Sequence, residues 1–317
     1  PNLASTEFVS QQYDHTVQGT TIISGLQGKG RVNGNASVIR PLFNSWKGVS
    51  VSQALYPHLT ESNPYLTAGI TIDQAIRNLI AVGTPLNHIA LLDNFCWCDS
   101  NSHERLWQLK ETARGCYDFA VGFGTPFISG KDSMFNDFLG YDENGNEVHI
   151  SVLPTLLISS IGVVKDIRKC QTMDFKFPYD EIYLVGNNSL GIEEIIETSI
   201  ANCKFVEEAI ENEIQSSSFA IGFGGIGIAL AKMSIAGQLG IDVQLEEEFL
   251  FSESPSRFLV TIAKENGEQF SKIVSRNNVA VTKLGTVLSS NKFSIKNLKN
   301  ETLLETGVEE LDEAYKK

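Results

Sequence analysis

The stretch TIDQAIRNLIAVGTPLNHIALLDNFCW, residues 71–97, joins a helical pattern to a strand pattern. Apolar residues in its first part recur at the spacing of one helix face, and Thr71 with Gln74 forms a capping box. Gly83 ends the helical pattern, and a β-type run follows at residues 89–93. The stretch therefore predicts a helix that begins at Thr71 and then a strand that ends in polar side chains.

Helical and strand patterns continue to alternate after this stretch. A second amphipathic helix is predicted over residues 102–122, and β-type runs follow at residues 126–129 and 155–164. The buried stripe of that helix is expected to hold Leu106, Leu109, Ala113, Cys116, Tyr117 and Ala120. Alternation of this kind is typical of an α+β or α/β fold.

An aperiodic segment that contains a proline, residues 168–180, separates two such patterned regions. A chain of 317 residues is about twice the usual size of a domain. We therefore expect a first domain over residues 1–170 and a second over residues 171–317.

Composition excludes several classes of protein. The formal net charge of −13 repels polyphosphate backbones, which argues against nucleic-acid binding, although a local pocket can still bind a small phosphorylated substrate. The five cysteines form no CxxC pair, which favours a reducing, cytoplasmic environment. No apolar run has the length of a membrane span, so no membrane partner is expected.

A polar segment follows the predicted strand of residues 126–129 and consists of Ser129, Gly130, Lys131, Asp132 and Ser133. Backbone N–H groups and an ammonium bind phosphate oxygens, and a carboxylate can hold a divalent cation beside them. A solvent-exposed turn is the other interpretation of so short a match. The segment is a candidate phosphate site.

A second polar pair, Asp93 and Asn94, lies where the strand of residues 89–93 ends. Carboxylate and amide oxygens are suitable ligands for Mg²⁺, whereas a local Asx turn is the structural alternative. Because loops gather at strand ends, we expect this pair to lie near the segment 129–133 at one edge of a sheet.

Several blocks resemble, in order along the chain, the C-terminal half of phosphoribosylformylglycinamidine synthase. They are QQYDHTVQG, NGNASVIRP, LLDNFCW, GTPFISGKDSMFND, TLLISSIGVVKDIRKC and FSESPSRFLVTIA. The resemblance implies a PurM-like N-terminal α+β domain with a pairing β-sheet, followed by a PurM-like C-terminal α/β domain. It also implies that the chain is a fragment, the second copy of a domain pair in a duplicated synthase.

The family reaction uses ATP and glutamine-derived ammonia to convert the amide of formylglycinamide ribonucleotide to an amidine. The resemblance thus implies part of an ATP-dependent carbon–nitrogen ligase of purine biosynthesis, with ATP or ADP and Mg²⁺ as cofactors. The implied partners are the N-terminal half of the synthase, a glutaminase domain or subunit and a small phosphorylated substrate. The isolated chain is expected to form a homodimer through its first-domain sheet.

The resemblance also implies which residues form the site. Nucleotide and phosphate contacts are assigned to Lys131, Ser129, Gly130, Ser133, Ser252, Ser254 and Arg257. Metal contacts are assigned to Asp93, Asn94, Asp132 and Asp14. The one catalytic candidate is His15, in the QYDH element.

Two elements depart from the family pattern. The HDxSDGGL-like element reads FAIGFGGI over residues 219–226, and Asn35 stands where the family has a metal-binding Asp. Loss of these carboxylates weakens magnesium binding. We infer a degenerate half that contributes to a composite site or holds a nucleotide without turnover.

Two other functions stay open at this point. The chain can be a non-catalytic module that only supports the catalytic half. More remotely, Gly222, Gly224 and Gly227 fit GxGxxG with Asp242 or Glu246 about 20 residues further on, as in a dinucleotide-binding dehydrogenase.

Overall fold

The computed structural model describes residues 3–14, 16–188 and 191–317. Its first part contains α1 (Glu7–Ser10), β1 (Thr21–Ile23), β2 (Leu26–Gln27), β3 (Val32–Asn33), β4 (Ala36–Ile39), β5 (Gly48–Leu55), α2 (Pro57–Thr60), α3 (Pro64–Ala81), β6 (Ile89–Cys96), α4 (His103–Phe123), β7 (Phe127–Ser133), β8 (Phe138–Tyr141), β9 (Glu147–Ile150) and β10 (Thr155–Val164). Its second part contains β11 (Glu181–Val185), α5 (Ile195–Glu211), β12 (Gln215–Ala220), α6 (Gly225–Gly237), β13 (Ile241–Gln244), β14 (Phe258–Ile262), α7 (Gly267–Asn277), β15 (Val281–Val287), β16 (Lys292–Lys296), β17 (Thr302–Gly307) and α8 (Val308–Lys316). Single 3₁₀ turns occupy Leu86–His88, Ile167–Lys169, Ile192–Glu194, Glu247–Phe249 and Lys264–Asn266.

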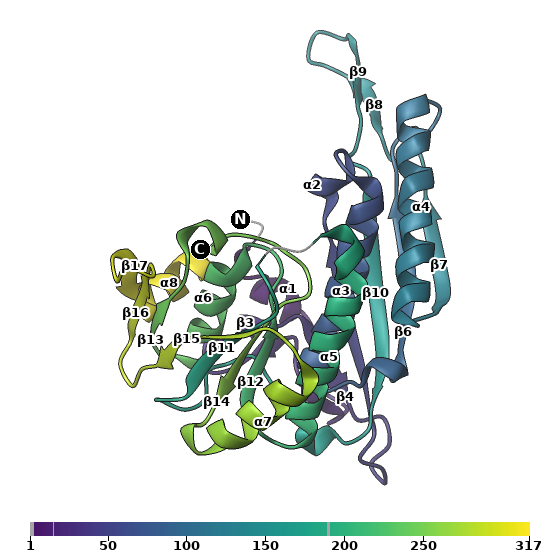
Figure 1. Cartoon of the computed structure of the whole chain (residues 1–317). Coiled ribbons are helices and arrows are strands. Elements are labelled where there is room, and N and C mark those ends of the chain that lie inside the picture. The colour runs from purple at the N-terminus through teal and green to yellow at the C-terminus, as the bar shows by residue number, and fades with distance from the viewer. Residues whose placement is uncertain (1–2, 15, 189–190) are drawn as a thin grey trace.

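Most of these strands form two large sheets, each with helices packed on it, while β2 with β3 and β8 with β9 form separate two-stranded pairs (Figure 1). The first sheet has the order β1-β4-β5-β10-β6-β7, and the second has the order β12-β14-β11-β15-β13-β16-β17. The architecture confirms the predicted mixed α+β and α/β fold. No helix in the described part of the chain is long and apolar enough to cross a membrane.

Helix α3 is longer than the sequence pattern predicts. It begins at Pro64, and the side chain of Asn63 caps it by accepting a hydrogen bond from the Leu66 N–H at 3.0 Å. The predicted start at Thr71 is therefore wrong: Thr71 lies inside the helix and donates its hydroxyl to the Thr67 carbonyl. Because α3 packs on the first sheet, α4, α5 and β12, nearly all of its side chains are buried.

Helix α4 is confirmed, with Ser102 as its cap, but its buried face differs from the predicted stripe. Leu106 and Tyr117 are 52% and 69% exposed, whereas Gln108 and Thr112 are buried. Gly115 explains the rotation, because a Cβ there would lie 2.5 Å from the Tyr65 carbonyl oxygen. Close approach of the α3 and α4 backbones at Gly115 decides which residues face inward.

The polar segments of residues 93–94 and 129–133 are parts of strands, not loops. Strand β6 continues through Asp93 and Asn94 to Cys96, and β7 continues to Ser133. The two strands pair in parallel, with Asp93 opposite Gly130 and Asn94 opposite Lys131. The prediction that the two segments are neighbours at a sheet edge is confirmed.

The second sheet has α6 and α8 on one side and α5 and α7 on the other (Figure 1). One hydrophobic cluster contains Ile76 of α3, Phe205 of α5 and Phe258 of β14, so it spans both sheets. A second cluster lies on the α6 side. The chain crosses from the first sheet to the second between β10 and β11, and the division into domains at residue 170 stays a prediction.

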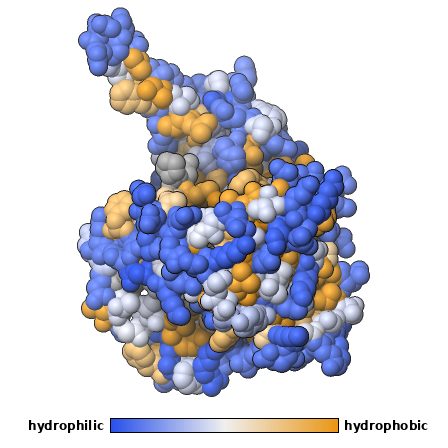
Figure 2. Space-filling view, turned by 90° about the vertical axis from the view of Figure 1, so that its left-hand side faces the viewer, coloured by the Kyte–Doolittle hydropathy of each residue, from blue (hydrophilic) through white to orange (hydrophobic). Residues whose placement is uncertain are grey.

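The hairpin of β8 and β9 stands clear of the rest of the molecule (Figure 1, Figure 2). Its strands pair only with each other among the described residues. The tip is hydrophilic, and hydrophobic residues gather at the base (Figure 2).

Candidate functional site

The predicted residues on β6 and β7 divide between the two faces of the first sheet. Side chains alternate along a strand, so in the observed register Asn94 and Lys131 share the open face. Asp93 and Asp132 share the helix-covered face, where Gly130 makes room for the carboxylate of Asp93: a Cβ there would lie 2.5 Å from Asp93 Oδ1. The structure thus brings together two pairs rather than one cluster.

Burial raises the pKa of Asp93, and the negative charge of Asp132 raises it further. Two carboxylates that repel each other in this way are suited to share a cation. Asp14 lies on another segment, where its carboxylate accepts hydrogen bonds from Thr16. The four predicted metal ligands are therefore not assembled in one place, and no group of three or more Asp, Glu, His or Cys in the described chain could hold a metal ion.

The remaining predicted phosphate residues on β7 are exposed or locally bonded. Ser129 is exposed, and the Ser133 hydroxyl donates to Asn136 Oδ1 at 2.8 Å. Lys131 is exposed and makes no hydrogen bond or ion pair within residues 3–14, 16–188 and 191–317. The catalytic candidate His15 lies outside the described residues.

The loop that contains Ser252, Ser254 and Arg257 is held by its own hydrogen bonds. Arg257 Nε donates to the Ser254 carbonyl at 3.0 Å, and its other nitrogens donate to Asn188 Oδ1 and the Ser252 carbonyl. The two serine hydroxyls lie 3.0 Å apart. Burial lowers the pKa of Arg257 to about 10. All of these donors face protein acceptors, so the loop is ordered internally and its predicted phosphate contact stays a prediction.

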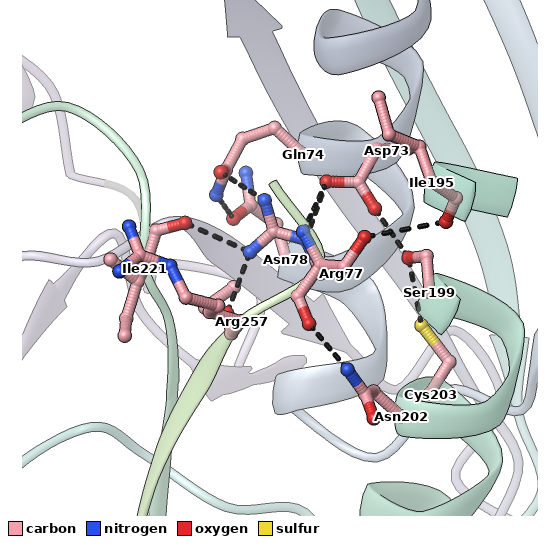
Figure 3. A network of polar contacts seen from close by, with 12 residues as sticks. Asp73, Gln74, Arg77, Asn78, Ile195, Ser199, Asn202, Cys203, Ile221 and Arg257 are labelled. Carbon is pink, nitrogen blue, oxygen red and sulfur yellow. Dashed lines mark hydrogen bonds and ion pairs between the residues drawn. The ribbon is translucent and has the colours of Figure 1, made fainter. Parts of the chain in front are cut away.

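A buried polar network that the sequence did not reveal joins α3 to the second sheet (Figure 3). The ion pair of Asp73 and Arg77 measures 2.7 Å, and both side chains are almost fully buried. Arg77 also donates to the carbonyls of Ile221 and Arg257 at 2.8 Å. Asp73 accepts from the Ser199 hydroxyl and from the backbone N–H of Ser256. Both charges are therefore satisfied from elements of the second sheet.

The network continues into a cleft between the sheets. Gln74 Oε1 accepts from Arg77 and, at 3.2 Å, from the Tyr56 hydroxyl, while Gln74 Nε2 donates to Asn78 Oδ1 at 2.7 Å. The cleft has a volume of about 520 Å³. Its walls include the amides of Asn35, Gln53, Gln74 and Asn78, the rings of Tyr56 and Phe223, and Lys232.

The altered element of residues 219–226 forms one wall of this cleft. Gly224 and Gly225 have φ angles of 77° and 66°, which glycine adopts readily. The Gly224 N–H donates to Glu253 Oε1 at 2.8 Å, and Glu253 Oε2 lies 3.4 Å from His58 Nε2. A carboxylate of the protein thus occupies the place where a dinucleotide would present its phosphates.

The sheet topology also disfavours the dinucleotide-binding alternative. Strand β12, which precedes the glycine turn, pairs antiparallel with β14. A dinucleotide-binding βαβ unit requires parallel strands joined by the helix. The GxGxxG match is therefore coincidental.

Comparison with known proteins agrees with this architecture. Residues 200–296 match the family model "AIR synthase related protein, C-terminal domain". The chain is 31% identical over 301 residues to the phosphoribosylformylglycinamidine synthase subunit PurL of Thermococcus sibiricus, covering 86% of this chain and 39% of that protein. The chain therefore spans less than half the length of this curated relative.

Solved structures with the same fold come from Thermotoga maritima. PurL complexed with ADP is 18% identical with a TM-score of 0.71 and covers 96% of this chain and 50% of that one. PurLQS is also 18% identical, with a TM-score of 0.70 and coverage of 92% and 48%. The same PurL has been solved in complex with ATP and with FGAR.

Residues 200–296 thus match the AIR synthase-related C-terminal domain, and the two sheets with their helices have the PurM-like fold. Within that class, the chain is a relative of phosphoribosylformylglycinamidine synthase, which confirms the resemblance read from the sequence.

Proposed function

We propose that this chain is the C-terminal half of a phosphoribosylformylglycinamidine synthase. The complete enzyme would convert formylglycinamide ribonucleotide to the amidine with ATP and ammonia. The similarity to PurL over 86% of this chain but 39% of that protein carries the proposal. Activity would belong to the paired halves, and this half would contribute one wall of a composite site.

The cleft offers a magnesium nucleotide amides rather than carboxylates. None of the described residues that line it is an Asp or Glu, and its polar side chains include Asn35, which stands where the family has an Asp, Gln74 and Asn78. Neutral amides are weaker ligands for Mg²⁺ than carboxylates. This supports a degenerate half without complete chemistry of its own.

A magnesium nucleotide, if bound by this half, would be held on β6 and β7. Asp93 and Asp132 share one face and fit Mg²⁺, which proteins usually hold with one or two carboxylates plus phosphate oxygens. Such an ion neutralises phosphate charge. Lys131, from the other face of β7, would bind a phosphate oxygen that reaches around the sheet edge.

The open face of the first sheet would receive the other half of the synthase. Val51, Ile128 and Ile161 are 48%, 65% and 40% exposed on it. A shallow pocket of about 740 Å³ lies between them. Contiguous apolar surface on a sheet marks an interface. For the isolated chain, a second copy would occupy the same face.

Ammonia would come from a glutaminase domain or subunit. Burial raises the pKa of the Cys116 and Cys170 thiols to about 12, so neither is a reactive thiolate at neutral pH. Thermotoga maritima PurLQS is a structure with the same fold.

Co-expression with the N-terminal half of a PurL relative tests the proposal. The pair should form the amidine from formylglycinamide ribonucleotide, ATP and ammonia, and neither half alone should. Turnover by this chain alone, or failure of the pair to associate, would refute a composite site. Full activity of the pair with Asp93→Asn, Lys131→Met and Asp132→Asn combined would favour the alternative, a non-catalytic supporting module.

A further inference from the structure

Lys232 is an ammonium in the wall of the cleft between the sheets, and none of the residues that the structure describes provides a counter-ion for it. It lies on α6 and lines the 520 Å³ cleft. Burial alone lowers its pKa, with no contribution from a carboxylate. Within the described chain it makes no hydrogen bond or ion pair. A half-buried charge of this kind destabilises the free protein, so it is more readily explained by a ligand than by folding.

Lys232 is the one charged side chain among the described residues that line the cleft. Behind the wall, burial raises the pKa of Tyr56, and the opposing charges of Arg77 and Arg257 and of Glu253 and Asp73 act on the same hydroxyl. The Asp73 carboxylate already forms an ion pair with Arg77 and accepts hydrogen bonds from the Ser199 hydroxyl and the Ser256 backbone N–H. No carboxylate is among the described residues that line the cleft, so the Lys232 ammonium is left to attract an anion there.

An aromatic wall lies in the same cleft. The Phe223 and Tyr56 rings stack with centroids 4.9 Å apart and planes at 13°. Tyr56 is buried, whereas Phe223 is partly exposed. A planar ring of a ligand can therefore stack on the exposed part of Phe223, as nucleic-acid bases stack on aromatic side chains.

Amide side chains complete the site. Asn35 donates to the Ala220 carbonyl at 3.2 Å and Asn78 to the Gln53 carbonyl at 3.3 Å, so both are held in place. Their remaining polar atoms and the Gln53 amide can bind hydroxyl or ring nitrogen groups. The volume suits a ligand the size of a nucleotide.

We propose that this cleft binds a phosphomonoester that carries a planar heterocycle, with its phosphate on Lys232 and its ring on Phe223, without a metal ion. This site is separate from the magnesium site proposed on β6 and β7. It consists of residues of this chain alone and does not depend on pairing with the other half.

Calorimetric titration of the full chain with AMP in the presence of EDTA tests the proposal. Binding should saturate, and Lys232→Met should raise the dissociation constant by at least about ten-fold, which corresponds to about 1.4 kcal/mol. Lys232→Arg should keep most of the affinity because it keeps the charge. The matched control Lys204→Met, at an exposed lysine on α5, should leave it unchanged.

A second variant distinguishes the contribution of the ligand's ring to binding from that of its phosphate. Phe223→Leu should weaken AMP but leave the weaker binding of inorganic phosphate unchanged, whereas Lys232→Met should weaken both. Absence of saturable AMP binding, loss of binding on adding EDTA, or equal affinity in Lys232→Met would each overturn the proposal. Lys232→Met should also raise the melting temperature of the free chain, a result that reports folding independently of ligand.

Discussion

At the scale of single residues, the charged side chains of this protein differ in whether they have partners. The buried side chains of Asp73 and Arg77 pair with each other and form further hydrogen bonds, whereas Lys131 and Lys232 have no hydrogen bond or ion pair within the described chain. The paired buried charges join α3 to the second sheet, whereas the unpaired ammonium groups are available to bind an anion. A cationic side chain thus has different roles in this protein, depending on whether a carboxylate lies beside it.

Breaking the buried ion pair should destabilise the whole chain. Asp73→Asn leaves the Arg77 charge buried without a counter-ion, so we expect a loss of about 3–5 kcal/mol in the free energy of unfolding. Urea denaturation should show a lower midpoint with an unchanged slope. The matched control Glu268→Gln breaks an exposed ion pair with Lys272 and should leave the midpoint unchanged.

Lys131 is the residue that tests nucleotide binding on β7. Lys131→Ala should weaken ATP binding by about 1.5–3 kcal/mol, the value of a charge-assisted contact, without altering the unfolding midpoint. Titration calorimetry with Mg²⁺ and ATP measures this. Equal affinity in wild type and variant would remove Lys131 from the site.

At the scale of elements, backbone contact between α3 and α4 decides which side chains become core. Gly115 lets α4 approach Tyr65, and this turns Gln108 and Thr112 inward while Leu106 stays outside. Hydrophobic periodicity alone predicts a buried stripe that shares Cys116 and Ala120 with the observed face but is rotated from it elsewhere. The packing of one small residue outweighs the weak amphipathic pattern of the helix.

Gly115→Ala should therefore separate the two helices. The added methyl group would meet the Tyr65 carbonyl at 2.5 Å and cost about 1–3 kcal/mol in unfolding free energy. Gly267→Ala at the start of α7 is the control, because a Cβ there meets nothing within 4 Å. Thermal unfolding should show a lower melting temperature only for Gly115→Ala, and equal values would contradict the proposed packing role.

At the scale of the whole molecule, the two sheets are joined through a shared hydrophobic cluster, yet one face of the first sheet remains open. A closed interior on one side and an apolar face on the other are expected of half of a larger assembly. The length of the chain relative to PurL is consistent with this.

We predict that the isolated chain forms a two-fold dimer through the open face. Sedimentation equilibrium at micromolar concentration should give about twice the 34.8 kDa of one chain. Ile161→Glu on β10 should dissociate the dimer, because it places a charge at the centre of the face. Leu298→Glu, at an exposed loop position, is the control. A mass of one chain for the wild type refutes dimerisation.

The sequence by itself determined the fold class, the extent of α4, the proximity of segments 93–94 and 129–133 at a sheet edge and the synthase resemblance, because local patterns and ordered motifs carry these. Only the tertiary structure decided the start of α3, the separation of Asp93 from Asn94 on opposite faces and the position of Lys232 in the cleft. The physical reason is that burial and partners of polar groups depend on contacts distant in sequence. The Asp73 carboxylate, for example, pairs with Arg77 four residues away, but it also accepts hydrogen bonds from Ser199 and Ser256, which are more than 100 positions away in the sequence.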